Sequence, residues 1–342
     1  MSSTHIPVEQ WPDPQPWRTS GQRYFSYKAY LQHQFGVRVQ RVSVDARFTC
    51  PNVDGKVAVG GCVFCNNASF SPSRRPASGP GPRLSIRAQI DDGISRLQRR
   101  YGDCQQFIAY FQPATNTYAP VDRLEELYRE ALSHPQVIGL AIGTRPDCAG
   151  NDVLDLLTDL ARTRYVSVEY GIQTIHNRSL DWMNRGHHHA ASIDAILRSR
   201  GRGFEIGAHV LYGLPGESRE DMQATARELA RLRVDAVKLH NLYVVRNTPL
   251  ATQVEQGVVT PPTRRDYVTA VVDTLEVLPP ITVIQRLGGE APGKYFLGPT
   301  WCLDKSGLLQ AIQEELLRRD TWQGKRFAAA DAAAANSAVP IA

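Results

Sequence analysis

Short apolar runs alternate with longer amphipathic stretches along most of the chain. The runs are rich in β-branched and aromatic residues, and several are apolar on both faces, which is typical of buried parallel strands. They cover residues 39–46, 106–112, 137–143, 165–171, 204–211 and 235–242. Between them, apolar residues recur every three or four positions, as at Ile86, Ile90 and Ile94, which predicts helices that bury one face.

Repeated alternation of strand and helix predicts parallel strands joined by right-handed crossovers. Doubly wound sheets and barrels share this pattern. Six repeats favour an open, partial (β/α)6 barrel of the TIM type over a closed eightfold barrel. In either architecture, functional side chains gather at the carboxyl ends of the strands.

The pattern changes near residue 250. A helix is predicted over 267–278, followed by a short strand at 281–285, a loop rich in Gly and Pro, and a final helix over 308–316. We therefore expect an α/β protein with four parts. These are an N-terminal extension over 1–38, the partial barrel over 39–250, a C-terminal α/β extension over 251–326, and a disordered tail over 327–342.

Composition excludes several classes of protein. The chain has 342 residues, of which 42% are hydrophobic and 21% charged, so it is long and apolar enough to bury a large core. No apolar run approaches the ~18 residues that cross a bilayer. The first residues lack the basic start and apolar stretch of a secretory signal. We therefore expect a cytoplasmic protein with no membrane partner.

Positive charge is concentrated in the first third of the chain. Residues 1–101 contain 14 Lys and Arg against six Asp and Glu, whereas the whole chain has a net charge of +5. Charge alone favours an ordinary solvated surface, and the alternative is a face that binds RNA phosphates. The candidates for that face are seven arginines, which are Arg74, Arg75, Arg83, Arg87, Arg96, Arg99 and Arg100.

Three of the six cysteines, Cys50, Cys62 and Cys65, lie within sixteen positions of each other and follow the first predicted strand. Three thiolates can hold three irons of a [4Fe–4S] cluster and leave the fourth iron open to another ligand. A structural zinc site would need a fourth ligand, and none follows at the usual spacing. The spacing therefore favours an iron–sulfur cluster, with zinc and inert thiols as alternatives. The adjacent His187, His188 and His189 are expected to begin a helix rather than to bind metal.

The loop ending Cys62-Val63-Phe64-Cys65 resembles the last part of the cysteine motif of radical S-adenosylmethionine (SAM) enzymes, with Phe64 as the aromatic residue before the last cysteine. The long spacing between the first two cysteines resembles that of YhcC-like proteins and of the radical SAM domain of the Elongator catalytic subunit. The resemblance extends over roughly residues 23–325. It includes the segments YFSYKAYLQHQFG, DARFTCPNVDG, AYFQPATNTYAP, VEYGIQTIHNRSLDWMNRGH, HVLYGLPGES, KLHNLYVVRNTPLA and APGKYFLGPTWCLDK.

This resemblance implies a partial TIM barrel, a [4Fe–4S] cluster on Cys50, Cys62 and Cys65, and SAM as cosubstrate. An electron donor such as flavodoxin or ferredoxin would be a partner, and the 5′-deoxyadenosyl radical formed from SAM would abstract hydrogen from the substrate. Relatives in the Elongator branch modify tRNA, so tRNA is one candidate substrate. The alternatives are a small metabolite or, in a different class, a zinc-dependent nucleic-acid-binding module.

The resemblance also suggests which residues contact SAM. Gln112 and Thr115 occupy the turn after the second strand, where backbone carbonyls would meet the methionine amine, and Arg185 would reach the carboxylate. A structural role in capping, pairing or packing is the alternative for each residue, and His209 stands where related oxidases carry an acid. The full set of cofactor-binding candidates is Phe64, Gln112, Thr115, Glu169, Gln173, Arg185, His209 and Leu211. Candidates for substrate contact are His240, Asn241, Gln285, Arg286, Trp301 and Lys305.

Overall fold

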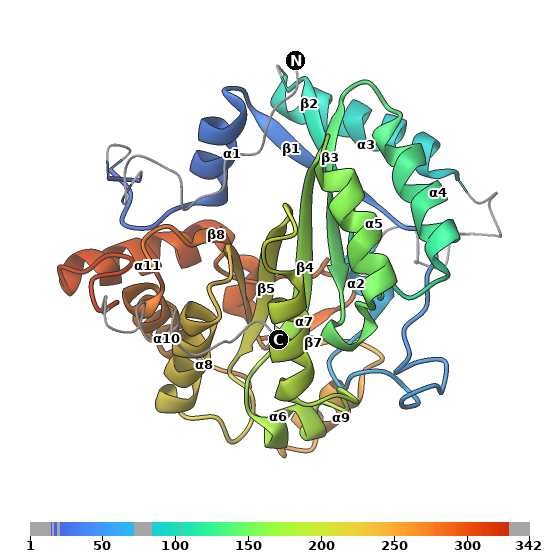
Figure 1. Ribbon diagram of the computed structural model, residues 1–342. Coiled ribbons are helices and arrows are strands. Elements are labelled where there is room, and N and C mark those ends of the chain that lie inside the picture. Colours follow the sequence, from blue (N-terminus) through green and yellow to red (C-terminus); the bar gives the residue numbers. More distant parts are fainter. Residues whose placement is uncertain (1–14, 16, 19–20, 72–83, 103, 328–342) are drawn as a thin grey trace.

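The computed structural model describes residues 15, 17, 18, 21–71, 84–102 and 104–327. Seven parallel strands form one sheet in the order β1-β2-β3-β4-β5-β6-β8, and the edge strands β1 and β8 are not paired with each other (Figure 1). The strands are β1 (Val39–Val44), β2 (Gln106–Phe111), β3 (Val137–Thr144), β4 (Tyr165–Gln173), β5 (Glu205–Tyr212), β6 (Ala236–Asn241) and β8 (Val283–Arg286). The sheet is therefore a curled partial barrel, as predicted.

Helices between the strands cover the outer face of the sheet (Figure 1). They are α3 (Ile86–Tyr101), α4 (Val121–Leu132), α5 (Asn151–Ala161), α7 (His189–Ser199), α8 (Arg219–Arg231) and α10 (Arg264–Val277). The short helix α6 (Asn177–Trp182) lies instead beyond the end of β4 (Figure 1), where its Leu180 joins a separate apolar cluster. The other helices are α1 (Tyr27–Phe35), α2 (Asn67–Phe70), α9 (Pro249–Glu255) and α11 (Lys305–Arg318). The small strands β7 (Val244–Val245) and β9 (Phe296–Gly298) form a separate antiparallel pair. His188 is the N-cap residue of α7, so the three histidines begin a helix as expected.

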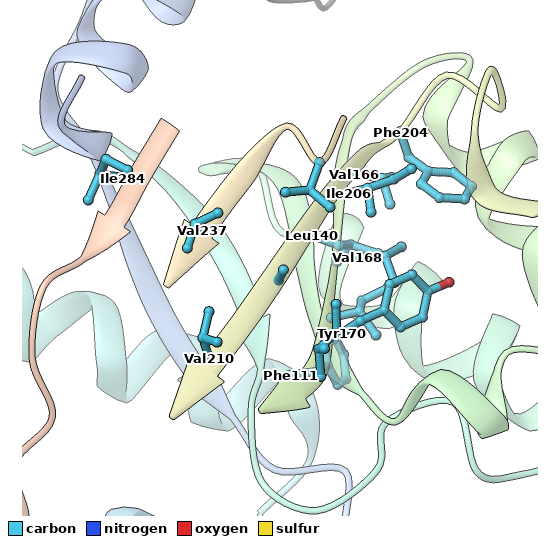
Figure 2. Close-up of a cluster of buried hydrophobic side chains, with 14 of the residues drawn as sticks. Phe111, Leu140, Val166, Val168, Tyr170, Phe204, Ile206, Val210, Val237 and Ile284 are labelled. Atoms are coloured by element: carbon cyan, nitrogen blue, oxygen red, sulfur yellow. The ribbon is translucent and has the colours of Figure 1, made fainter. Parts of the chain in front are cut away.

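The helices bury the apolar faces that the periodicity predicts. In α3, Ile86, Ile90 and Ile94 are buried against the sheet, and Ser85 caps the first turn by accepting a hydrogen bond from the backbone N–H of Ala88. Val166, Val168 and Tyr170 of β4 point into the same core (Figure 2). Burying each such side chain contributes about 1.5–3 kcal/mol, which is the main force holding helices on this face.

In each strand, the side chains at the alternate positions face the inside of the barrel. Successive side chains in a strand point to opposite faces. Since Val166, Val168 and Tyr170 face the helices, Tyr165 and Glu169 face inward. At the amino ends of the strands the interior is filled by a second apolar cluster in which α1 packs against Ile108, Tyr165 and Val283. The interior is therefore closed at the amino ends of the strands.

The strand predicted at 281–285 is present as β8, but it joins the main sheet. It pairs in parallel with β6, and the backbone N–H of Ile284 donates to the carbonyl of Phe25, 2.7 Å away, just before α1. The segment after residue 250 thus supplies a seventh barrel strand, and the N-terminal segment lies beside it. Within the described part of the chain, no helix has the length and apolarity to cross a membrane. Arg74, Arg75, Arg83 and residues 328–342 lie outside the described residues.

Candidate functional site

A cavity of about 410 Å³ opens at the carboxyl ends of the strands. Every residue that the sequence identifies as a cluster ligand or a SAM contact lies on its wall, although these residues come from loops and strands far apart in the chain. They are Cys50, Cys62, Phe64, Cys65, Gln112, Thr115, Glu169, Gln173, Arg185, His209 and Leu211. The tertiary fold therefore brings all eleven residues to one place.

The cysteine loop is held in a defined shape by its own backbone and by Asn52. The N–H of Val53 donates to the carbonyl of Cys50 at 2.8 Å, and the N–H of Cys65 donates to that of Cys62 at 2.9 Å. Gly60 and Gly61 have φ angles of 85° and 78°, which only glycine adopts without strain. The fully buried Asn52 donates through Nδ2 to the carbonyls of Asn184 and Arg185, which ties the loop to the segment after α6.

The donor set of this loop fits an iron–sulfur cluster. Three cysteines and no carboxylate of the loop line the cavity, and thiolates are the ligands that such clusters use. Among the described residues, no three His, Cys, Asp or Glu side chains are placed to hold a single metal ion. A fourth cysteine, Cys148, does not line the cavity, and burial raises the pKa of its thiol to about 12, which keeps it protonated.

Phe64 separates the cysteine loop from solvent on one side. Its ring packs against an apolar cluster that includes Leu180, Met183, Leu211 and Leu250. The N–H of Val63 donates to the carbonyl of Met183 at 3.1 Å, and the N–H of Leu250 donates to that of Val63 at 2.9 Å. Phe64 and Leu211 therefore form an apolar wall that would exclude water from bound cofactor.

The turn after β2 presents an unsatisfied polar group to the cavity. Ala114 has a φ angle of 64°, an uncommon value for a residue with a side chain, and it lines the cavity beside Thr115. Thr115 is fully buried, and its hydroxyl has no hydrogen-bond partner. A buried hydroxyl without a partner costs free energy. A ligand in the cavity that bonds to Thr115 would remove this cost.

Arg185 bridges the cysteine loop and β4. Its Nη2 donates to the carbonyl of Gly171 at 2.6 Å and its Nη1 lies 3.5 Å from the Sγ atom of Cys62, while its buried Nε has no partner. No described carboxylate forms an ion pair with this guanidinium, so its positive charge is available to an anionic ligand. A Cβ atom on Gly171 would lie 2.7 Å from Nη2 and 2.9 Å from Nε2 of Gln173, so a larger residue here would displace the ends of these side chains.

Glu169 lies at the centre of a buried charge cluster on the cavity floor. Its Oε1 lies 2.6 Å from Nη1 of Arg41, and its Oε2 lies 2.8 Å from Nζ of Lys238 and 2.7 Å from Nε2 of His209. Burial raises the pKa of Glu169, but the charges of Arg41 and Lys238 outweigh it and hold the pKa well below its usual value. Both oxygens are already paired, so a SAM hydroxyl would have to share the carboxylate with His209.

Burial shifts the pKa values of the basic groups in the cluster downward. Burial lowers the pKa of Lys238 to about 8 and that of His209 to about 4. His209 is therefore neutral near pH 7, and its Nε2 carries the proton that Glu169 accepts. Lys238 also donates to the hydroxyl of Tyr110 at 2.8 Å. The cluster thus contains one fully buried carboxylate and two largely buried cations on the cavity floor.

Sequence analysis did not identify Arg41, Tyr110 and Lys238 as site residues. The sequence did indicate two of them, because Arg41 and Lys238 are charged residues inside predicted buried strands. A charge in such a position must find partners. Of the predicted substrate contacts, His240, Asn241 and Arg286 line the cavity. Gln285 and Lys305 line a neighbouring cavity, whereas Trp301 packs on Tyr267 and donates to the carbonyl of Pro262 at 3.0 Å.

Two models of known protein families match this chain. A family model described as the Radical SAM superfamily matches residues 57–229, and a Radical_SAM C-terminal domain matches residues 234–318. The chain is 36% identical to the uncharacterized protein YtqA of Bacillus subtilis, and the match covers 92% of this chain and 96% of that protein. It is 33% identical to protein YhcC of Escherichia coli over 80% of this chain and 85% of that protein.

Two further matches concern proteins of the Elongator type. The chain is 30% identical to a tRNA uridine(34) acetyltransferase of Dehalococcoides mccartyi, and the match covers 48% of this chain but only 36% of that protein. A solved structure of Elp3 from Methanocaldococcus infernus superposes with a TM-score of 0.58 at 17% identity, over 83% of this chain and 64% of that one. This structural match confirms the partial-barrel fold.

Proposed function

Because this chain belongs to the radical SAM superfamily and is an enzyme of that kind, we propose that it binds a [4Fe–4S] cluster through Cys50, Cys62 and Cys65 and cleaves SAM reductively. The observation that carries this proposal is the single cavity that holds all three cysteines together with the candidate SAM contacts. Members of this superfamily normally use both groups. The abstracted hydrogen atom would come from a second molecule, the substrate, which is not identified.

A [4Fe–4S] cluster held by Cys50, Cys62 and Cys65 would supply the electron for reductive cleavage of SAM, and a donor such as flavodoxin or ferredoxin would provide that electron. The protein positions the reactants. Arg185 offers its guanidinium to the methionine carboxylate, and the turn at Gln112 and Thr115 offers backbone and hydroxyl groups to the amine. Gln173, His209 and Leu211 would border the nucleoside.

The charge cluster would act as a rigid floor rather than as a reactant. Arg41, Glu169 and Lys238 come from three different strands, and their ion pairs link β1, β4 and β6 across the barrel interior. Phe64 and Leu211 would exclude water from the part of the cavity that they line. Exclusion of water would strengthen the electrostatic contacts between the protein and the bound cofactor.

Anaerobic reconstitution with iron and sulfide tests this proposal. We expect about four irons per chain, as one cluster requires, and formation of 5′-deoxyadenosine when SAM and dithionite are added. The zinc alternative predicts tight stoichiometric zinc and no iron uptake. Iron uptake without 5′-deoxyadenosine would contradict the enzymatic proposal while leaving the cluster in place.

The substrate is the less defined part of the proposal. The match to a tRNA uridine(34) acetyltransferase supports tRNA as a candidate, although this chain spans only 36% of that protein. The described arginines of α3 give weaker support, because Arg87 pairs with Asp91 and Arg96 pairs with Asp92 on the same helix. Comparison of modified nucleosides and metabolites between a deletion strain and its parent distinguishes tRNA from a small metabolite.

A further inference from the structure

A second cavity of about 620 Å³ lies in the gap between the edge strands β1 and β8. Its walls come from α1, β1, β8 with the loop that follows it, and the start of α11. The elements α1, β8 and α11 lie on the left of the molecule in Figure 1. Arg41, Arg286 and Glu290 line both this cavity and the site cavity. The two spaces are therefore adjacent, and these three side chains lie between them.

Positive charge dominates this gap. Five cationic side chains and one carboxylate, that of Glu290, line it. The cations are Lys28, Arg38, Arg41, Arg286 and Lys305. Arg41 is neutralised by Glu169, but no described carboxylate lies within ion-pair distance of Lys28, Arg286 or Lys305. Clefts lined by one sign of charge concentrate ligands of the opposite sign, so the gap favours an anion.

Arg286 lies at the junction between the two cavities and lacks a counter-ion. Its Nε donates to the carbonyl of Gly288, and no described group accepts from its other guanidinium nitrogens. Its charge acts on His240: burial lowers the pKa of that imidazole well below its usual value, and Arg286 lowers it further. The adjacent Gln285 has a buried side-chain amide in which neither Oε1 nor Nε2 has a partner. The junction thus has unpaired hydrogen-bond donors beside an uncompensated cation.

We propose that the substrate enters between β1 and β8 and carries a phosphate group that Arg286 holds at the junction of the two cavities. A phosphate offers several acceptor oxygens to a guanidinium fork and matches the excess of cations better than a carboxylate does. The phosphate belongs either to a nucleic-acid backbone or to a free phosphorylated metabolite. The inference rests on the proposed function, because it assumes that the site cavity is where the substrate reacts.

Binding measurements on the reconstituted protein test the inference with two probes. The first is fluorescein-labelled bulk tRNA, followed by anisotropy at 50 and 150 mM KCl, and the second is inorganic pyrophosphate, followed by calorimetry. We expect Arg286→Gln to weaken binding of the probe about tenfold, the loss that corresponds to one charge-assisted hydrogen bond. For tRNA, the slope of log affinity against log salt should fall by about 0.7–0.9, as removal of one phosphate contact requires.

Two further variants separate charge from structure. Arg286→Lys keeps the positive charge and should restore part of the affinity. Arg227→Gln removes an exposed arginine of α8 that forms no ion pair with a described residue, and it should bind like the wild type. The iron content and melting temperature of each variant show that it is folded and loaded.

Each outcome decides between specific possibilities. Binding of tRNA identifies a nucleic-acid phosphate, and binding of pyrophosphate alone identifies a free phosphorylated metabolite. The inference is overturned if neither probe binds at 50 mM KCl, or if Arg286→Gln binds like the wild type. The proposed function is judged separately, since it fails only if the wild-type protein takes up no iron or forms no 5′-deoxyadenosine.

Discussion

Glu169→Gln is the change that best tests the buried charge cluster. The carboxylate is fully buried and forms ion pairs with Arg41 at 2.6 Å and with Lys238 at 2.8 Å. Glutamine keeps the shape and removes the charge, so two buried cations lose their counter-ion. Breaking a buried ion pair by removing one partner costs about 3–5 kcal/mol. Since one kcal/mol shifts the melting temperature of a protein of this size by roughly 2 °C, we expect a decrease of about 6–10 °C.

A pH series gives this prediction a specific signature. The pKa of Lys238 in the folded protein is about 8, below the ~10.4 of an unfolded chain. The unfolded state therefore binds more protons between these values, and stability rises with pH across that window. Without the carboxylate, burial and the nearby charges of Arg41 and Arg286 lower the pKa of Lys238 further. The stability of Glu169→Gln should therefore rise between pH 6.5 and 8, where the contribution of Lys238 to wild-type stability is nearly constant.

Thermal unfolding monitored by circular dichroism measures both effects. The control is Glu169→Gln combined with Lys238→Met, which removes one of the two cations that Glu169→Gln leaves without a counter-ion. It should recover part of the lost stability and show no rise between pH 6.5 and 8, because the titrating amine is gone. A decrease below 2 °C for Glu169→Gln, or the same pH dependence with and without Lys238, would refute the reasoning.

The remaining predictions concern the cofactors. Replacing any one of Cys50, Cys62 and Cys65 by Ala should abolish iron uptake, because a cluster with three protein ligands would lose one of them; normal iron content in any of these variants defeats the assignment. Replacing Cys104, Cys148 or Cys302 by Ala should leave the iron content near four per chain, and about eight irons in the wild type would show an auxiliary cluster. Gly171→Ala places a methyl group 2.7 Å from Nη2 of Arg185 and should raise the KM for SAM in the cleavage assay. Gly293→Ala, which meets no atom within 4 Å, is its control, and an equal effect of both changes would argue against the role of Arg185.

The proposed cluster ligands and the barrel strands were accessible from the sequence because they depend on local pattern. Cys50, Cys62 and Cys65 lie on one loop, so their spacing alone suggests a shared ligand. The period of apolar residues predicts strands such as β2 and β4 and the helices that cover them, since burial of one face is a local requirement. The same periodicity predicts the inward position of Glu169.

The partners of inward-facing residues were decided by the tertiary structure. Arg41 and Lys238 lie 128 and 69 positions from Glu169 in the chain and meet it only because β1, β4 and β6 curl around one interior. Periodicity specifies which face of a strand is buried, but it does not specify which strands lie opposite each other across a curved sheet. For the same reason, the sequence predicted a strand at 281–285 but not its place as the seventh strand of the sheet. The pairing of β8 with β6 is accompanied by contacts with Phe25 and α1 from the other end of the chain, and it leaves the gap beside β1 that borders the site.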